Sequence, residues 1–149
     1  MKVAALISRI LLGLIFLVFG LNGFLNFMPG QLPTGQAGEF LSALVQSHYG
    51  LFISAVEIVS GAFLLANRYV VLGLVLIGPV IVNILLFHVF LLPSGLFVAI
   101  FVAILWGVVA FRHRQYFSGL FVQRASQGLT EGLDRREVLD EYQSATSRA

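Results

Sequence analysis

Glu57 is the residue of this sequence with the clearest chemical potential, because its carboxyl group lies inside an otherwise apolar stretch. If that stretch crosses a membrane, a charge near its centre costs at least about 2.5–3.5 kcal/mol, and such residues usually face the protein interior. Protonation or pairing with a cation lowers this cost. Ser54 and Gly61 lie three residues before and four residues after Glu57, so a helix places all three on one face.

Five further polar residues lie within apolar stretches and are candidates for the same site: Arg9, Asn22, Asn26, Asn83 and His88. Each also has a structural interpretation. Asparagines hold membrane helices together through hydrogen bonds of about 0.6–2 kcal/mol. Arg9 can extend its side chain to the membrane surface or towards Glu57, and His88 is close enough to the end of its stretch for interfacial placement. The sequence therefore leaves both roles open.

No metal, haem or iron–sulfur cofactor is expected. The sequence has no cysteine, which excludes disulfides, iron–sulfur clusters and a thiol relay carried by this chain. His48, His88 and Glu57 lack the spacing of metal ligands. A single histidine within the apolar stretches is a weak basis for haem ligation.

The composition is far from that of a water-soluble protein. The 149 residues are 58% hydrophobic and 11% charged, with a mean hydropathy of +0.94, whereas soluble domains carry roughly 25% charged residues. A soluble enzyme, a disordered tail and a nucleic-acid binder are excluded, although the net charge is +2. The basic residues mostly flank apolar runs, as in membrane proteins.

Four apolar stretches approach the length of about 20 residues that crosses a bilayer; they cover about 4–27, 49–66, 69–92 and 95–112. They lack the alternating polarity of barrel strands, so each must be a helix. The first is too long for a signal peptide and no A-x-A site follows it, so we expect it to be retained. The prediction is an all-α membrane protein, a four-transmembrane-helix bundle over residues 1–112.

The basic residues predict the orientation, because cytoplasmic loops of membrane proteins are rich in lysine and arginine. The connections 28–48 and 92–95 contain neither residue. The other ends of the four stretches carry Lys2, Arg9, Arg68, Arg112 and Arg114. Both termini are therefore predicted in the cytoplasm.

Two segments are expected outside the membrane. Residues 36–48 place apolar side chains at helical spacing, which predicts a short amphipathic helix on the outer surface. This helix either shields the ends of its neighbours or acts as a lid. The polar tail, 113–149, is expected in the cytoplasm, where Leu133 to Val138 fit a capping box that begins a helix to about Ser144.

The predicted topology brings the candidate residues to comparable depths. The first and third helices run outward and the second runs inward, so the two asparagines of the first helix, Asn83 and His88 lie in the outer half. Glu57 lies deeper and can form the floor of a polar pocket that opens outward. Pro79, one turn before Asn83, is expected to kink its helix beside this pocket.

Three short motifs resemble the DoxX family of small four-helix bacterial membrane proteins: Arg9 followed by L-G-L-I-F-L-V-F-G, Glu57 followed by V-S-G-A-F-L-L, and Pro79-x-x-x-Asn83-x-x-x-x-His88. The resemblance covers about residues 3–112. It implies a four-span fold in a bacterial cytoplasmic membrane. The family is named after a subunit of an archaeal thiosulfate:quinone oxidoreductase, and relatives have been linked to oxidative-stress complexes, so the resemblance implies a quinone as a candidate ligand.

The sequence is compatible with three functions. The first is a membrane subunit that binds a small lipophilic or redox molecule around Glu57, at most the membrane part of a quinone-linked oxidoreductase. The second is an assembly or scaffolding protein without a ligand. The third is a pathway for protons or small solutes. The expected partners are the lipid bilayer, subunits of an oxidoreductase or other membrane complex, and further copies of this chain, with no nucleic acid.

Overall fold

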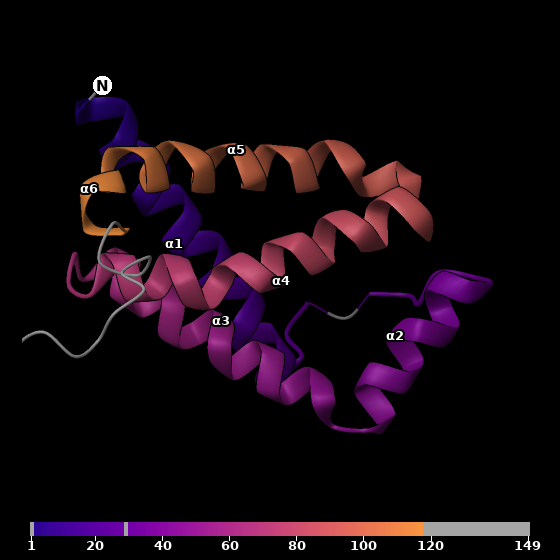
Figure 1. Ribbon diagram of the computed structural model, residues 1–149. Coiled ribbons are helices and arrows are strands. Elements are labelled where there is room, and N and C mark those ends of the chain that lie inside the picture. The colour runs from indigo at the N-terminus through magenta and orange to yellow at the C-terminus, as the bar shows by residue number, and fades with distance from the viewer. Residues whose placement is uncertain (1, 29, 118–149) are drawn as a thin grey trace, which may run out of the picture. The chain divides into compact units, whose positions relative to one another are not determined.

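The computed structural model of the protein describes residues 2–28 and 30–117, and these ranges contain helices and no strand. This confirms the all-helical prediction. The chain divides into two units, Met1–Arg114 and Gln115–Ala149, and the first holds the long helices (Figure 1). The capping box at Leu133 to Val138 lies outside the described residues.

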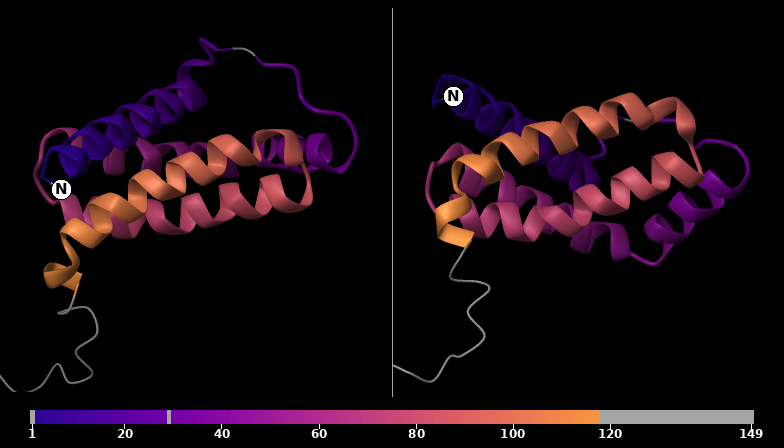
Figure 2. Two further views of the ribbon diagram at one scale, coloured as in Figure 1. Left: turned by 90° about the horizontal axis from the view of Figure 1, so that it is seen from above. Right: turned by 45° about the horizontal axis from the view of Figure 1, so that its top comes forward.

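Four long helices pack around one core. They are α1 (Lys2–Leu25), α3 (Tyr49–Leu65), α4 (Val70–Phe90) and α5 (Leu96–Arg112). The shorter elements are α2 (Gln36–Gln46), η1 (Pro93–Gly95) and α6 (Arg114–Phe117). The helix α1 packs most extensively on α3 and also contacts α5, while α4 contacts both α3 and α5 (Figure 2). Each long helix therefore has two long neighbours.

Membrane-spanning potential is clear for three helices. By length and composition, α1, α4 and the segment Pro93–Arg112 qualify. The helix α3 has 17 residues and measures about 26 Å, slightly less than the hydrocarbon thickness of about 30 Å. It qualifies together with α2, to which it is bent by 82°. The structure thus has three candidate spans, or four if this bent pair counts as one, and fits a multi-pass membrane protein.

The distribution of apolar side chains agrees with a lipid environment. The core is formed by fully buried residues such as Leu12, Leu74 and Ile77. Many large apolar side chains nevertheless face outward, including Phe97 at 86% exposure and Phe90 at 75%. Apolar patches of this extent are rare on soluble monomers.

Small residues set the close packing of α1 on α3. A Cβ atom at Gly20 would lie 2.8 Å from the carbonyl oxygen of Ser54. A Cβ atom at Gly61 would lie 2.8 Å from the carbonyl oxygen of Gly13 and 2.8 Å from the amide nitrogen of Leu17. These glycines therefore allow the backbones of the two helices to approach closely.

Candidate functional site

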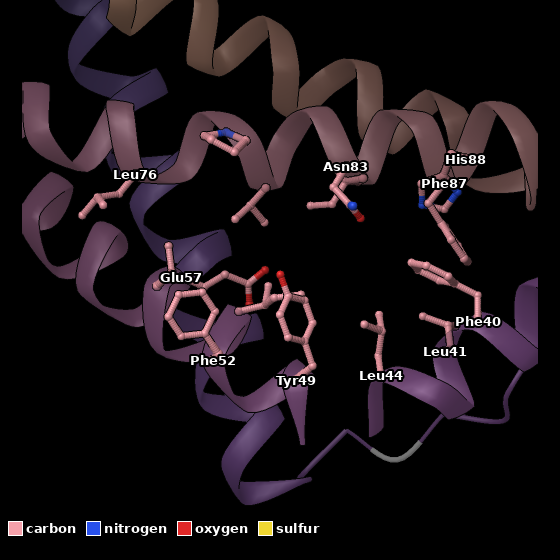
Figure 3. A pocket seen from close by; sticks show the side chains of 15 residues that line it. Phe40, Leu41, Leu44, Tyr49, Phe52, Glu57, Leu76, Asn83, Phe87 and His88 are labelled. Carbon is pink, nitrogen blue, oxygen red and sulfur yellow. The ribbon is translucent and has the colours of Figure 1, made fainter. Parts of the chain in front are cut away.

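A cavity of about 560 Å³ lies between α2, α3 and α4 (Figure 3). Glu57, Asn83 and His88 line it, so the structure brings three of the six candidate residues together. Its other walls are mainly aliphatic and aromatic. Ligand sites of proteins commonly enclose about 300–1,000 Å³ and combine apolar walls with a few polar groups. The cavity has both properties.

Helical periodicity explains which side chains reach the cavity. On α3, Tyr49, Ile53 and Glu57 are four residues apart and share one face. On α4, Leu76, Val80 and Asn83 repeat at intervals of four and three residues and likewise face the cavity. The sequence therefore directs one stripe of each helix towards the other.

Glu57 is the acidic side chain of the cavity and is partly buried. Figure 3 shows its carboxylate and the Tyr49 hydroxyl directed into the same part of the cavity, with the Asn83 amide on the opposite wall. Among residues 2–28 and 30–117, neither Glu57 nor Asn83 has a hydrogen-bonding or ionic partner for its side chain. Glu57 is partly buried and Asn83 is exposed along this wall. Both side chains are therefore available to a bound molecule.

His88 lines the cavity but has a structural contact of its own. Its Nδ1 lies 2.9 Å from the carbonyl oxygen of Leu92, and because a carbonyl only accepts, Nδ1 carries the hydrogen. The ring also stands edge-on to Phe87, with 5.3 Å between ring centroids. It abuts Gly95, where a Cβ atom would lie 2.0 Å from the imidazole Cε1. These contacts tie the end of α4 to the turn that begins α5.

We expect Gly95→Ala to destabilise the protein by about 1 kcal/mol, because the new methyl group displaces the His88 ring and breaks its hydrogen bond to Leu92. Thermal unfolding in detergent measures this change. The control is the same substitution in a His88→Ala background, where no ring is present to be displaced and the cost should largely disappear. An equal cost in both backgrounds would contradict the proposed packing.

The other three candidate residues lie away from the cavity lining. The Asn22 Oδ1 accepts a hydrogen bond of 2.7 Å from the backbone N–H of Met28. Asn26 has a positive φ of 47° immediately after α1, a conformation that asparagine adopts more readily than most residues. The helix therefore ends at Leu25, two residues before the predicted limit of the first stretch. Both asparagines shape the end of α1.

Arg9 is 9% exposed and donates a hydrogen bond to the carbonyl oxygen of Leu64. Leu64 lies seven residues after Glu57, a distance of about 10 Å along α3. The guanidinium group therefore neutralises the carbonyl end of α3, where helical donors are missing and the helix dipole is negative. The alternative in which Arg9 reaches towards Glu57 is not what the structure shows.

Tyr49, Phe40 and Phe52 line the cavity but were not among the residues predicted for the site. The spacing of Tyr49 could have indicated its place in the site, because Tyr49 lies eight residues before Glu57 and hence on the same helical face. Phe40 comes from α2 and packs against Phe87 of α4, with 5.7 Å between ring centroids. No local pattern in the sequence indicates that long-range contact.

Comparison with known proteins adds no assignment, since no family model, curated protein or solved structure matches this chain. The resemblance to the DoxX family stays a prediction.

Proposed function

We propose that this chain is a multi-pass membrane protein that binds a small lipophilic or redox molecule in the cavity between α2, α3 and α4. The observation that carries the proposal is a cavity of about 560 Å³ in which the Glu57 carboxylate has no partner within the described residues. Glu57 anchors the polar part of the ligand, and Asn83 offers both a donor and an acceptor. The DoxX resemblance makes a quinone one candidate.

The proposed topology has four spans in a bacterial cytoplasmic membrane, with both termini in the cytoplasm and α2 on the outer side. In Figure 1, the start of α1, the link between α3 and α4, and the end of α5 lie at one end of the first unit. Lys2, Arg68 and Arg112 belong to these three places. A basic end of this kind supports a cytoplasmic position. The helix α2 lies at the other end.

The test is mass spectrometry of small molecules that co-purify with the protein in mild detergent. We expect a stoichiometric compound in the wild type that is lost from Glu57→Gln, because the variant keeps the size of the side chain but removes its charge. Glu39→Gln is the matched control, since Glu39 is an exposed carboxyl group of α2 that does not line the cavity. It should retain the compound.

Absence of any specific compound, with Glu57→Gln less thermostable than wild type, would contradict this proposal and favour the scaffolding alternative. The pathway alternative has a separate test in liposomes. Transport of protons or solutes that depends on Glu57 would favour it over ligand binding.

A further inference from the structure

The charges around the cavity indicate which kind of head group it takes. Glu57 is the one acidic residue among the described residues of the lining, which include no lysine and no arginine. The buried cation Arg9 is directed to the carbonyl of Leu64 instead. A carboxylate in an apolar site is costly unless a cation or hydrogen-bond donors compensate it or a proton neutralises it. Within this part of the chain, no side chain supplies that cation.

Aromatic rings from three helices add to the same preference. Phe40 belongs to α2, Tyr49 and Phe52 belong to α3, and Phe87 belongs to α4. Figure 3 shows the Tyr49 ring beside the Glu57 carboxylate, the Phe52 ring on the other side of Glu57, and the Phe40 and Phe87 rings together at the far end of the cavity. The faces of aromatic rings carry negative electrostatic potential and attract cations such as substituted ammonium groups. Both the carboxylate and the rings therefore favour a positive charge.

We infer that the cavity binds a lipophilic organic cation, with its ammonium-type head against Glu57 and its apolar body along the walls formed by α2 and α4. This inference rests on the proposed function and specifies the ligand class of that same site. The cation supplies the countercharge that the cavity lining lacks. A neutral quinone presents carbonyl oxygens, which only accept hydrogen bonds, so it would meet an ionised Glu57 as acceptor against acceptor.

The cavity is accessible to such a molecule. Phe52 is 65% exposed and Tyr49 is 57% exposed, so the wall contributed by the first turn of α3 opens to the surface. Both side chains precede Glu57 on the same helix. An apolar body can enter along these rings while the charged head moves towards the carboxylate.

The test compares two probes of nearly equal shape, (4-phenylbenzyl)trimethylammonium and its uncharged carbon isostere 4-neopentylbiphenyl, by calorimetry with the protein in lipid nanodiscs. A short-chain benzoquinone is the third probe. We expect the cation to bind wild type at least about tenfold more tightly than the isostere, since the contribution of one desolvated ion pair to binding readily exceeds a tenfold change in affinity. Empty nanodiscs provide the blank for partition into lipid.

Variants separate the charge of Glu57 from its other contributions. In Glu57→Gln the ratio of the affinities for the cation and for its isostere should fall to about the value of an uncharged site. Glu57→Asp and the control Glu39→Gln should keep the ratio of the wild type. If Glu57→Gln does not fold, the comparison of the two probes on wild type and on Glu57→Asp still tests whether the cavity prefers a cation. Equal or tighter binding of the isostere or the quinone would overturn the inference and leave the proposed function intact. Binding of none of the three probes, together with no co-purifying compound, would overturn both.

Discussion

Gly61→Val is expected to destabilise the protein by about 1–3 kcal/mol, the usual cost of added atoms in a tightly packed contact. A side chain at position 61 would meet the carbonyl oxygen of Gly13 and the amide nitrogen of Leu17, each 2.8 Å from the new Cβ atom. Both are backbone atoms and cannot rotate away, so α1 and α3 must separate. This contact is the most extensive between any two helices of the described chain.

Unfolding by titration with a denaturing detergent measures the change in the free energy of unfolding. Gly107→Val is the matched control, because a Cβ atom at Gly107 of α5 has no atom within 4 Å. Intrinsic helix preference favours valine over glycine by a few tenths of a kcal/mol at both positions, so it cannot account for a loss at Gly61 alone. Equal effects of the two substitutions would show that α1 and α3 are not in close contact.

The sequence predicted the helical architecture well, because hydropathy and length carry most of the information on membrane helices. The limits of the four predicted stretches differ from those of the observed helices by only a few residues. The differences have local causes. Asn26 takes a left-handed conformation that ends α1 at Leu25, and α3 ends at Leu65, just before the turn that contains Asn67 with a φ of 55°.

The candidate site was predictable only in part. Depth along the helices suggested that Glu57, Asn83 and His88 lie near one another, and they line one cavity. Depth says nothing about the direction of a side chain around the helix axis, which is why Asn22, at a similar depth, is bonded to the backbone of Met28 instead. The contribution of α2 depends on the 82° bend between α2 and α3, which no residue pattern specifies.

Pro79 lies inside the continuous helix Val70–Phe90, and the kink predicted there stays a prediction. The missing N–H of proline removes a single hydrogen bond. On the neighbouring turn, the Trp106 indole of α5 donates a hydrogen bond of 3.0 Å to the carbonyl oxygen of Leu74. The proline forms part of the cavity wall beside Asn83.

Arg9→Met is expected to lower the free energy of unfolding by about 1.5–3 kcal/mol, the usual contribution of a hydrogen bond that involves a charged group. Methionine keeps the unbranched apolar part of the side chain but cannot donate to the Leu64 carbonyl. Arg9→Lys should lose less, because an ammonium group still interacts favourably with the end of the α3 dipole. Detergent-titrated unfolding measures all three proteins.

Lys2→Met is the control, since it removes the same charge from an exposed position on the same helix and should change the stability by less than about 0.5 kcal/mol. Binding of the trimethylammonium probe discriminates between the two roles considered for Arg9. A residue that only neutralises the end of α3 should leave the tenfold preference for the cation unchanged, because its guanidinium lies about 10 Å along the helix from Glu57. If Arg9→Met instead abolished cation binding without loss of stability, Arg9 would belong to the ligand site, and its bond to Leu64 would be of secondary importance.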